Sequence, residues 1–176
     1  MQSRKGQVML TKLKPEELKY DNLAWICIMP TILTIQGKSM EIKADVYHHQ
    51  LNNGQKGLYM FYSYHNHTKS IFEFYWFAFY FMSEVKSWIG LKKGMSYFKD
   101  EAILSIYEEL ETLIEKKHKR PDGTWAQASP SDIEKDKELF ASINKLYIRY
   151  NTLVPNTIKH MNAYIRNHTE EFIEFE

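Results

Sequence analysis

The sequence predicts an all-α protein, with residues 1–176 forming a single-domain helical bundle of six or seven helices around a central aromatic helix. The chain has 176 residues, of which 44% are hydrophobic, so it can bury one sizeable core but would make two thin ones. Apolar residues also recur at helical spacing, most regularly over residues 103–114. We expect residues 1–10 to be disordered ahead of this bundle.

The central helix is predicted from the segment Ile71 to Met82, in which eight of twelve residues are aromatic and Glu73 is the one charge. Twelve residues exceed a typical strand, and helical spacing continues through Ile89. A helix that is apolar on all sides belongs inside a bundle, so we expect this one in the core, with a dimer interface as the alternative. A membrane anchor would need a polar face, which the segment lacks.

Proline, glycine and asparagine divide the first third of the chain. Pro15 is followed by two glutamates, which is typical of a first helical turn, and Pro30 should kink or end that helix. Residues 32–35 either resume the helix or form a short extended piece, and the next helix covers residues 40–51. Residues 52–57 predict a turn that closes this helix, because Asn and Gly tolerate the left-handed backbone, and the following helix should start at Leu58.

Longer helices are predicted for the rest of the chain. We expect one helix from Thr68 to Ile89, ended by Gly90, and another over residues 96–117. Residues 121–130 form the longest loop. The capping-box pattern of residues 131–134 predicts the start of the next helix, and Pro155 predicts the start of the last one.

Charge and cysteine content limit the classes of function. The net charge of +1 argues against a general polyanion binder and against a strongly acidic decoy. Cys27 is the single cysteine and stands in an apolar stretch, so we expect a buried core thiol, no disulfide and a reducing, cytoplasmic location. No apolar run approaches the roughly 18 residues that a membrane span requires, so we expect no membrane partner.

Four histidines are the candidates for a metal or acid-base site. They are His48, His49, His65 and His67, with Asp45 one helical turn before the first pair. A metal-dependent enzyme that uses this cluster is one alternative function. However, no His-Glu-x-x-His pattern or spaced cysteine set accompanies them, and nucleotide-binding and nucleophile-elbow motifs do not occur. We therefore expect no catalytic residues and no cofactor, with the histidines hydrogen-bonded or at the surface.

A resemblance concerns the segment from Leu51 to Tyr62, where an Asn-Gly turn runs into an aromatic helix, and the stretch Tyr164 to Phe172 with its Glu-Glu-Phe finish. In both places the chain resembles a family of small helical bacterial proteins that is catalogued as a domain of unknown function and includes a DNA-mimic protein. The resemblance implies a shared helical fold from about Glu41 to the end. The near-neutral charge lacks the acidic surface on which DNA mimicry depends, so we do not expect that activity.

We interpret the protein as a non-enzymatic regulator, inhibitor or immunity-type protein of bacterial or phage origin that acts by contact with another protein. A homodimer and a nucleic-acid binder that uses the basic end of the 96–117 helix are the other hypotheses. Loops on a rigid scaffold usually carry recognition. The predicted contact residues are therefore Asn52, Asn53, Lys116, Lys117, Lys119, Arg120 and Trp125.

Overall fold

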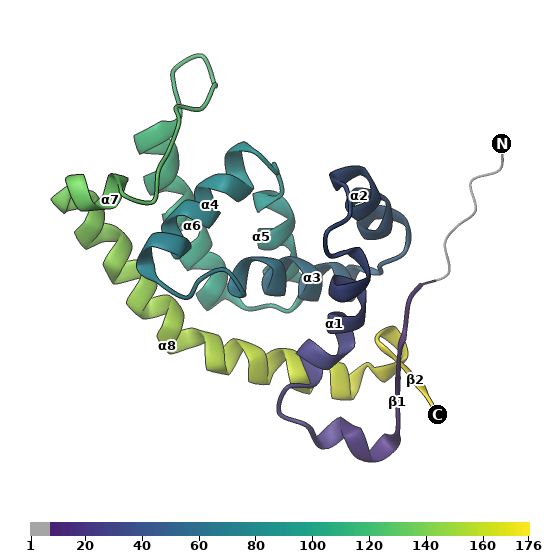
Figure 1. Cartoon of the computed structure of the whole chain (residues 1–176). Helices are drawn as coiled ribbons and strands as arrows, with labels where there is room; N and C mark the ends of the chain where they lie inside the picture. The colour runs from purple at the N-terminus through teal and green to yellow at the C-terminus, as the bar shows by residue number, and fades with distance from the viewer. Residues whose placement is uncertain (1–7) are drawn as a thin grey trace.

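The long helix α8 runs along one side of the molecule, and the chain's other helices lie against it or extend away from it (Figure 1). The computed structural model describes residues 8–176. In chain order the elements are β1 (Thr11–Leu13), the 3-10 helix η1 (Pro15–Lys19), α1 (Leu23–Ile35), α2 (Met40–His49), α3 (Asn53–His65), α4 (Ile71–Ser83), α5 (Trp88–Tyr97), α6 (Glu101–His118), α7 (Asp132–Lys135), α8 (Lys137–Asn167), the 3-10 helix η2 (Thr169–Glu171) and β2 (Ile173–Phe175).

The predicted all-α, single-domain bundle is confirmed, but the described residues form eight α-helices instead of six or seven, with a minor sheet that the sequence did not predict. The strands β1 and β2 pair in parallel, with Thr11 opposite Ile173, so they join the two ends of the described chain. Of residues 1–10, which we expected to be disordered, 1–7 lie outside the described residues. Met9 donates its backbone N–H to the Gln50 carbonyl at 3.2 Å, so the chain is already tied to the body at that point.

The predicted turn at residues 52–57 is wrong, because these residues form the first turns of α3. Asn52 is the N-cap residue: its side chain accepts from the Gln55 N–H at 2.9 Å, and the Gln55 side chain accepts from the Asn52 N–H at 3.1 Å. This reciprocal capping box satisfies two N–H groups that a helix start leaves open. The helix therefore begins at Asn53 instead of Leu58.

The glycines of this segment serve close helix packing. A Cβ atom added at Gly57 would lie 3.2 Å from the Cα of Gly94 on α5, and one added at Gly94 would lie 2.7 Å from the Cα of Gly57. Only two glycines allow the backbones of α3 and α5 to approach this closely. Gly90, which we predicted to end a helix, also lies inside α5.

The single helix predicted for residues 68–89 is two helices. Ser70, and not Thr68, caps α4 by accepting from the Glu73 N–H at 3.2 Å. The chain then turns between α4 and α5, where Lys86 takes a left-handed φ of 54°. Local periodicity did not reveal this break because the apolar residues on both sides of it fit one helical pattern.

Pro30, where we expected a kink or an end, does not end its helix but lies inside α1, and the helix start predicted at Pro155 is wrong because this proline lies inside α8. Both prolines are exposed, so water can reach the carbonyl that each leaves without its helical N–H. The helix start predicted at residues 131–134 is only the single turn α7. The cap of α8 is Asp136, which accepts from the Leu139 N–H at 3.0 Å.

Aromatic side chains from four helices meet in the core. The fully buried Tyr64 packs against Phe74, Tyr107 and Tyr150, at centroid distances of 5.7–6.3 Å. Cys27 is buried as expected, and burial raises the pKa of its thiol to about 12. One face of α4 joins this core. Its other face is only half-buried and carries Phe72, Trp76, Phe77 and Tyr80.

We expect Gly94→Ala to lower the free energy of unfolding by about 2 kcal/mol, because the new methyl group meets backbone that cannot rotate away. Urea denaturation at equilibrium measures this change. Gly90→Ala in the same helix is the matched control, since its Cβ would meet the Tyr47 hydroxyl at 3.1 Å, which is the movable end of a side chain. The control should be neutral or stabilising, because Ala favours a helix over Gly by about 1 kcal/mol. Equal losses in both variants would contradict the close-packing account.

Candidate ligand-binding groove

The main candidate site is an apolar groove bounded by α1, α2, α3, α4 and α5. It consists of two adjoining hollows of about 350 and 500 Å³. The same six residues line both hollows, which makes them parts of one groove: Met40, Lys43, Tyr59, Ser63, Phe81 and Val85.

Helix α2 and the end of α1 form the outer wall of the groove. Val46 is the buried residue of α2, so this helix is held to the body by little apolar contact. Figure 1 shows α2 at the opposite end of the molecule from α7. Three large side chains at the rim remain exposed to water, namely Leu33 at 56%, Met40 at 54% and Ile89 at 63%. The groove therefore continues into an exposed apolar surface.

Polar groups in the groove are few, and their charge has one sign. Lys43, Lys86 and Lys93 line the first hollow, and among residues 8–176 no Asp or Glu lines either hollow. Burial raises the pKa of Tyr47 and of Tyr59, so their hydroxyl groups stay neutral at physiological pH. The groove can therefore supply apolar contact, neutral hydroxyl groups and positive charge.

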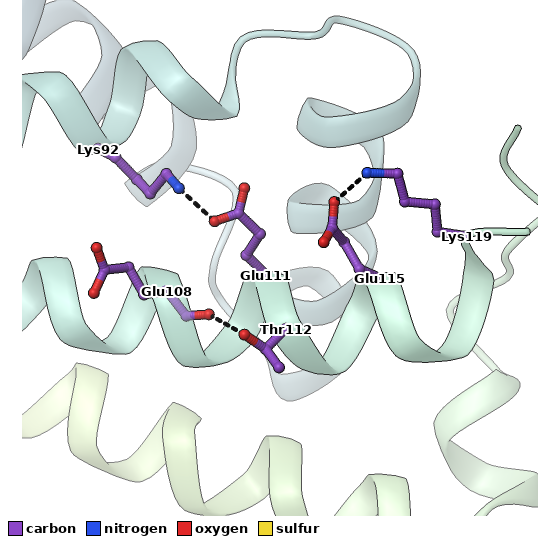
Figure 2. Close-up of polar contacts among 6 residues, drawn as sticks. All are labelled: Lys92, Glu108, Glu111, Thr112, Glu115 and Lys119. Carbon is purple, nitrogen blue, oxygen red and sulfur yellow. Dashed lines mark hydrogen bonds and ion pairs between the residues drawn. The ribbon is translucent and has the colours of Figure 1, made fainter. Parts of the chain in front are cut away.

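Four of the predicted contact residues lie at the C-terminal end of α6, where internal ion pairs occupy two of them. Lys117 Nζ lies 2.6 Å from Asp136. Lys119 Nζ lies 2.6 Å from Glu115, the pair that Figure 2 shows. Lys116 and Arg120 are exposed. Lys116 and Arg120 are thus the two positive charges left for a partner at this end of α6, whereas the sequence predicted four.

Trp125 is half-buried and attaches the α6–α7 loop to the body. Its ring packs edge-on against Phe79, with centroids 5.8 Å apart, and Lys119 Nζ lies 5.6 Å from its centroid. The Ala126 N–H also donates to the His118 carbonyl at 2.7 Å. The structure thus gives Trp125 an internal packing role, while its contact with a partner stays a prediction.

Asn52 is also used within the fold. Besides capping α3, its side-chain amide donates to the Glu171 carbonyl at 2.6 Å. Asn53 is exposed on the first turn of α3. Neither asparagine lines the groove, and both lie at the start of α3 instead of in the predicted loop.

The four candidate histidines do not form a metal site. No group of three or more His, Cys, Asp or Glu side chains in the described part of the chain is placed to hold a metal ion. His49 Nδ1 lies 2.9 Å from Asp45, and His65 Nδ1 lies 3.0 Å from the Tyr150 hydroxyl. His67 stacks on Phe77 with centroids 4.2 Å apart. His48 and His67 line different hollows of the groove.

Sequence reasoning missed the groove because its residues come from five helices and none belongs to a motif. The one available signal was the composition of the α2 segment. Met40 and Ile42 are apolar, but they do not form a broad apolar helix face with other apolar residues. Both are exposed, at 54% and 47%. Such a helix is poorly explained by core packing alone.

Comparisons with protein families, with curated proteins and with solved structures gave no match. The resemblance to the family that includes a DNA mimic therefore stays a prediction. Among the described helices, none is both long and apolar enough to cross a membrane.

We expect acid to destabilise the protein through His65. Burial, with a further contribution from Lys69, lowers the pKa of His65 to about 4, so between pH 6.5 and 4 the unfolded chain binds a proton that the folded protein does not. The free energy of unfolding should fall across this window, by an amount on the order of 2 kcal/mol from this residue after solvent screening. Burial also lowers the pKa of His118, which adds to the same trend.

The measurement is urea denaturation at several pH values for the wild type and for His65→Gln, which keeps a polar group near Tyr150 but does not titrate. The variant should show a shallower loss of stability below pH 6.5. Parallel curves for the two proteins would contradict this assignment.

Proposed function

We propose that this protein is not an enzyme and that it binds a segment of another protein in the groove between α2 and α3–α5. The observation that carries the proposal is the groove itself, in which a long apolar hollow opens onto exposed apolar side chains. Contiguous exposed apolar surface in a water-soluble fold is typical of a protein-binding site. A regulator, inhibitor or immunity-type protein of a bacterium or phage is the role that we propose for it.

The rim favours a macromolecular ligand over a small molecule. Sites for small molecules bury most of the ligand inside a concave pocket. Here Leu33, Met40 and Ile89 lie at the edge with more than half of their surface exposed, where a small ligand in the hollow would leave them uncovered. A peptide segment or helix lying along the groove would cover both the hollow and the rim.

The two alternatives from the sequence receive less support. The metal-enzyme hypothesis required His65 and His67 to converge with His48 or His49, and they do not form such a group among residues 8–176. The nucleic-acid hypothesis required a free basic cluster at the end of α6, and two of its four charges are paired. A cytoplasmic location remains part of the proposal and is supported by the lone, buried thiol of Cys27.

Site-specific photo-crosslinking in the native host tests this proposal. A photoreactive phenylalanine analogue replaces Ala44, which is exposed and lines the first hollow. In the matched control it replaces Ile148, which is 58% exposed on α8 and lies outside both hollows. We expect a protein adduct from position 44 that is absent from position 148.

A second substitution makes the result specific to the groove. Met40→Asp places a charge at the apolar rim and should weaken binding at least tenfold, so the adduct at position 44 should fade, whereas Ile148→Asp should leave it unchanged. The same adducts from both positions, or an adduct indifferent to Met40→Asp, would show that the groove is not the binding site.

A further inference from the structure

We infer that the segment bound in the groove is acidic as well as apolar, and that Lys43, Lys86 and Lys93 recognise its carboxylates. This inference rests on the proposed function and adds the chemistry of the partner. The three lysines line the first hollow together with apolar residues such as Met60 and Val85.

Charge in the groove is distributed very differently from charge elsewhere in the protein. The chain has 22 acidic and 23 basic residues, yet in the described structure neither hollow is lined by a carboxylate. Three lysines outside the groove, Lys92, Lys117 and Lys119, form ion pairs within the fold, and Figure 2 shows the pairs Lys92–Glu111 and Lys119–Glu115. Lys93 follows Lys92 directly in the sequence, but it lines the groove without such a partner.

None of the three groove lysines forms an ion pair within the described part of the chain. They also come from different elements: Lys43 from α2, Lys86 from the α4–α5 turn and Lys93 from α5. A carboxylate-bearing segment in the hollow would therefore meet positive charge from both sides of it. Complementary charges of this kind select a partner and speed its association.

The start of α5 adds to the positive potential in the same hollow. Ser87 is the N-cap residue of α5 but makes no side-chain cap hydrogen bond, and its buried Oγ has no partner in residues 8–176. The first N–H groups of a helix carry a partial positive charge that favours an anion nearby. Ser87 lines the first hollow next to Lys86, so the start of α5 borders the same space as this lysine.

An acidic protein segment fits these features better than a nucleic acid does. Phosphate recognition requires a continuous basic track along the groove, whereas apolar side chains separate these lysines and the whole chain carries only +1. A second copy of this chain is also a poorer fit. Its acidic, apolar C-terminal stretch is already used, since Phe172 packs against Gly54 and residues 173–175 pair with β1.

Selection from a phage-displayed library of short random peptides tests the inference with a defined probe. Three baits are compared: the wild type, the triple variant Lys43→Gln, Lys86→Gln and Lys93→Gln, and a control with the same change in net charge. The control carries Lys135→Gln, Lys145→Gln and Lys159→Gln, at exposed positions that line neither groove hollow. Circular dichroism and thermal unfolding confirm that all three baits are folded.

We expect the wild type and the control to select apolar peptides enriched in Asp and Glu. Synthetic copies of these peptides should bind the groove variant about tenfold to a hundredfold more weakly, since each exposed ion pair contributes roughly a two- to fivefold effect. Added salt should weaken binding to the wild type more than binding to the groove variant. Met40→Asp should weaken binding of the same peptides.

The other outcomes separate this inference from the proposed function. Groove-dependent peptides without acidic enrichment, bound equally by the triple variant, would overturn the inference and leave protein binding intact. Two further probes test other ligand classes: dodecanoate stands for a fatty acid and oligothymidylate for a single-stranded nucleic acid. If no peptide depends on Met40 and one of these probes binds the groove, both the inference and the proposed function are wrong. If sedimentation shows a concentration-dependent dimer that buries the groove, the occupant of the groove is a second copy of this chain and not a segment of another protein.

Discussion

The close approach of α3 and α5 at Gly57 and Gly94 is the contact on which the arrangement of the other elements depends. With backbone against backbone, neither helix can shift without opening the core beside Tyr64. The beginning of α3 is fixed at the same time, because Asn52 caps it and holds the Glu171 carbonyl. One short segment thus sets a helix crossing, a helix start and the position of the chain's C-terminal end.

Residues 52–57 make several contacts at once, which explains why the sequence analysis assigned them to a turn instead of a helix. Asn and Gly favour turns as single residues, but Asn52 and Gln55 form a local capping box that starts a helix, and the glycines serve close contacts with α5 and Phe172, far away in the sequence. The regular stripe of residues 103–114 needed no distant partner to be recognised, and α6 contains it, although this helix begins at Glu101 and not at the predicted residue 96. The prolines in α1 and α8 were misjudged for the same reason, since their exposure depends on tertiary structure.

The candidate site was still less predictable than the fold. The sequence pointed to loops and charge clusters, and the structure uses Asn52, Lys117 and Lys119 for internal contacts. The groove arises where side chains of five helices fail to fill the space between them, which is a property of packing and not of any local pattern. The histidines illustrate the converse, because proximity in sequence did not bring them into one cluster.

The lysines that we propose to attract an acidic segment also oppose closure of the groove. Burying Leu33, Met40 and Ile89 under a collapsed α2 would gain hydrophobic free energy, on the order of 1 kcal/mol for each side chain. Such a collapse would bring Lys43 toward Lys86 and Lys93, with the like charges partly desolvated, and their repulsion opposes that gain. A bound carboxylate would remove the repulsion while its apolar neighbours fill the hollow. In this proposal, recognition of an acidic, apolar segment and resistance of the groove to closure have one physical cause.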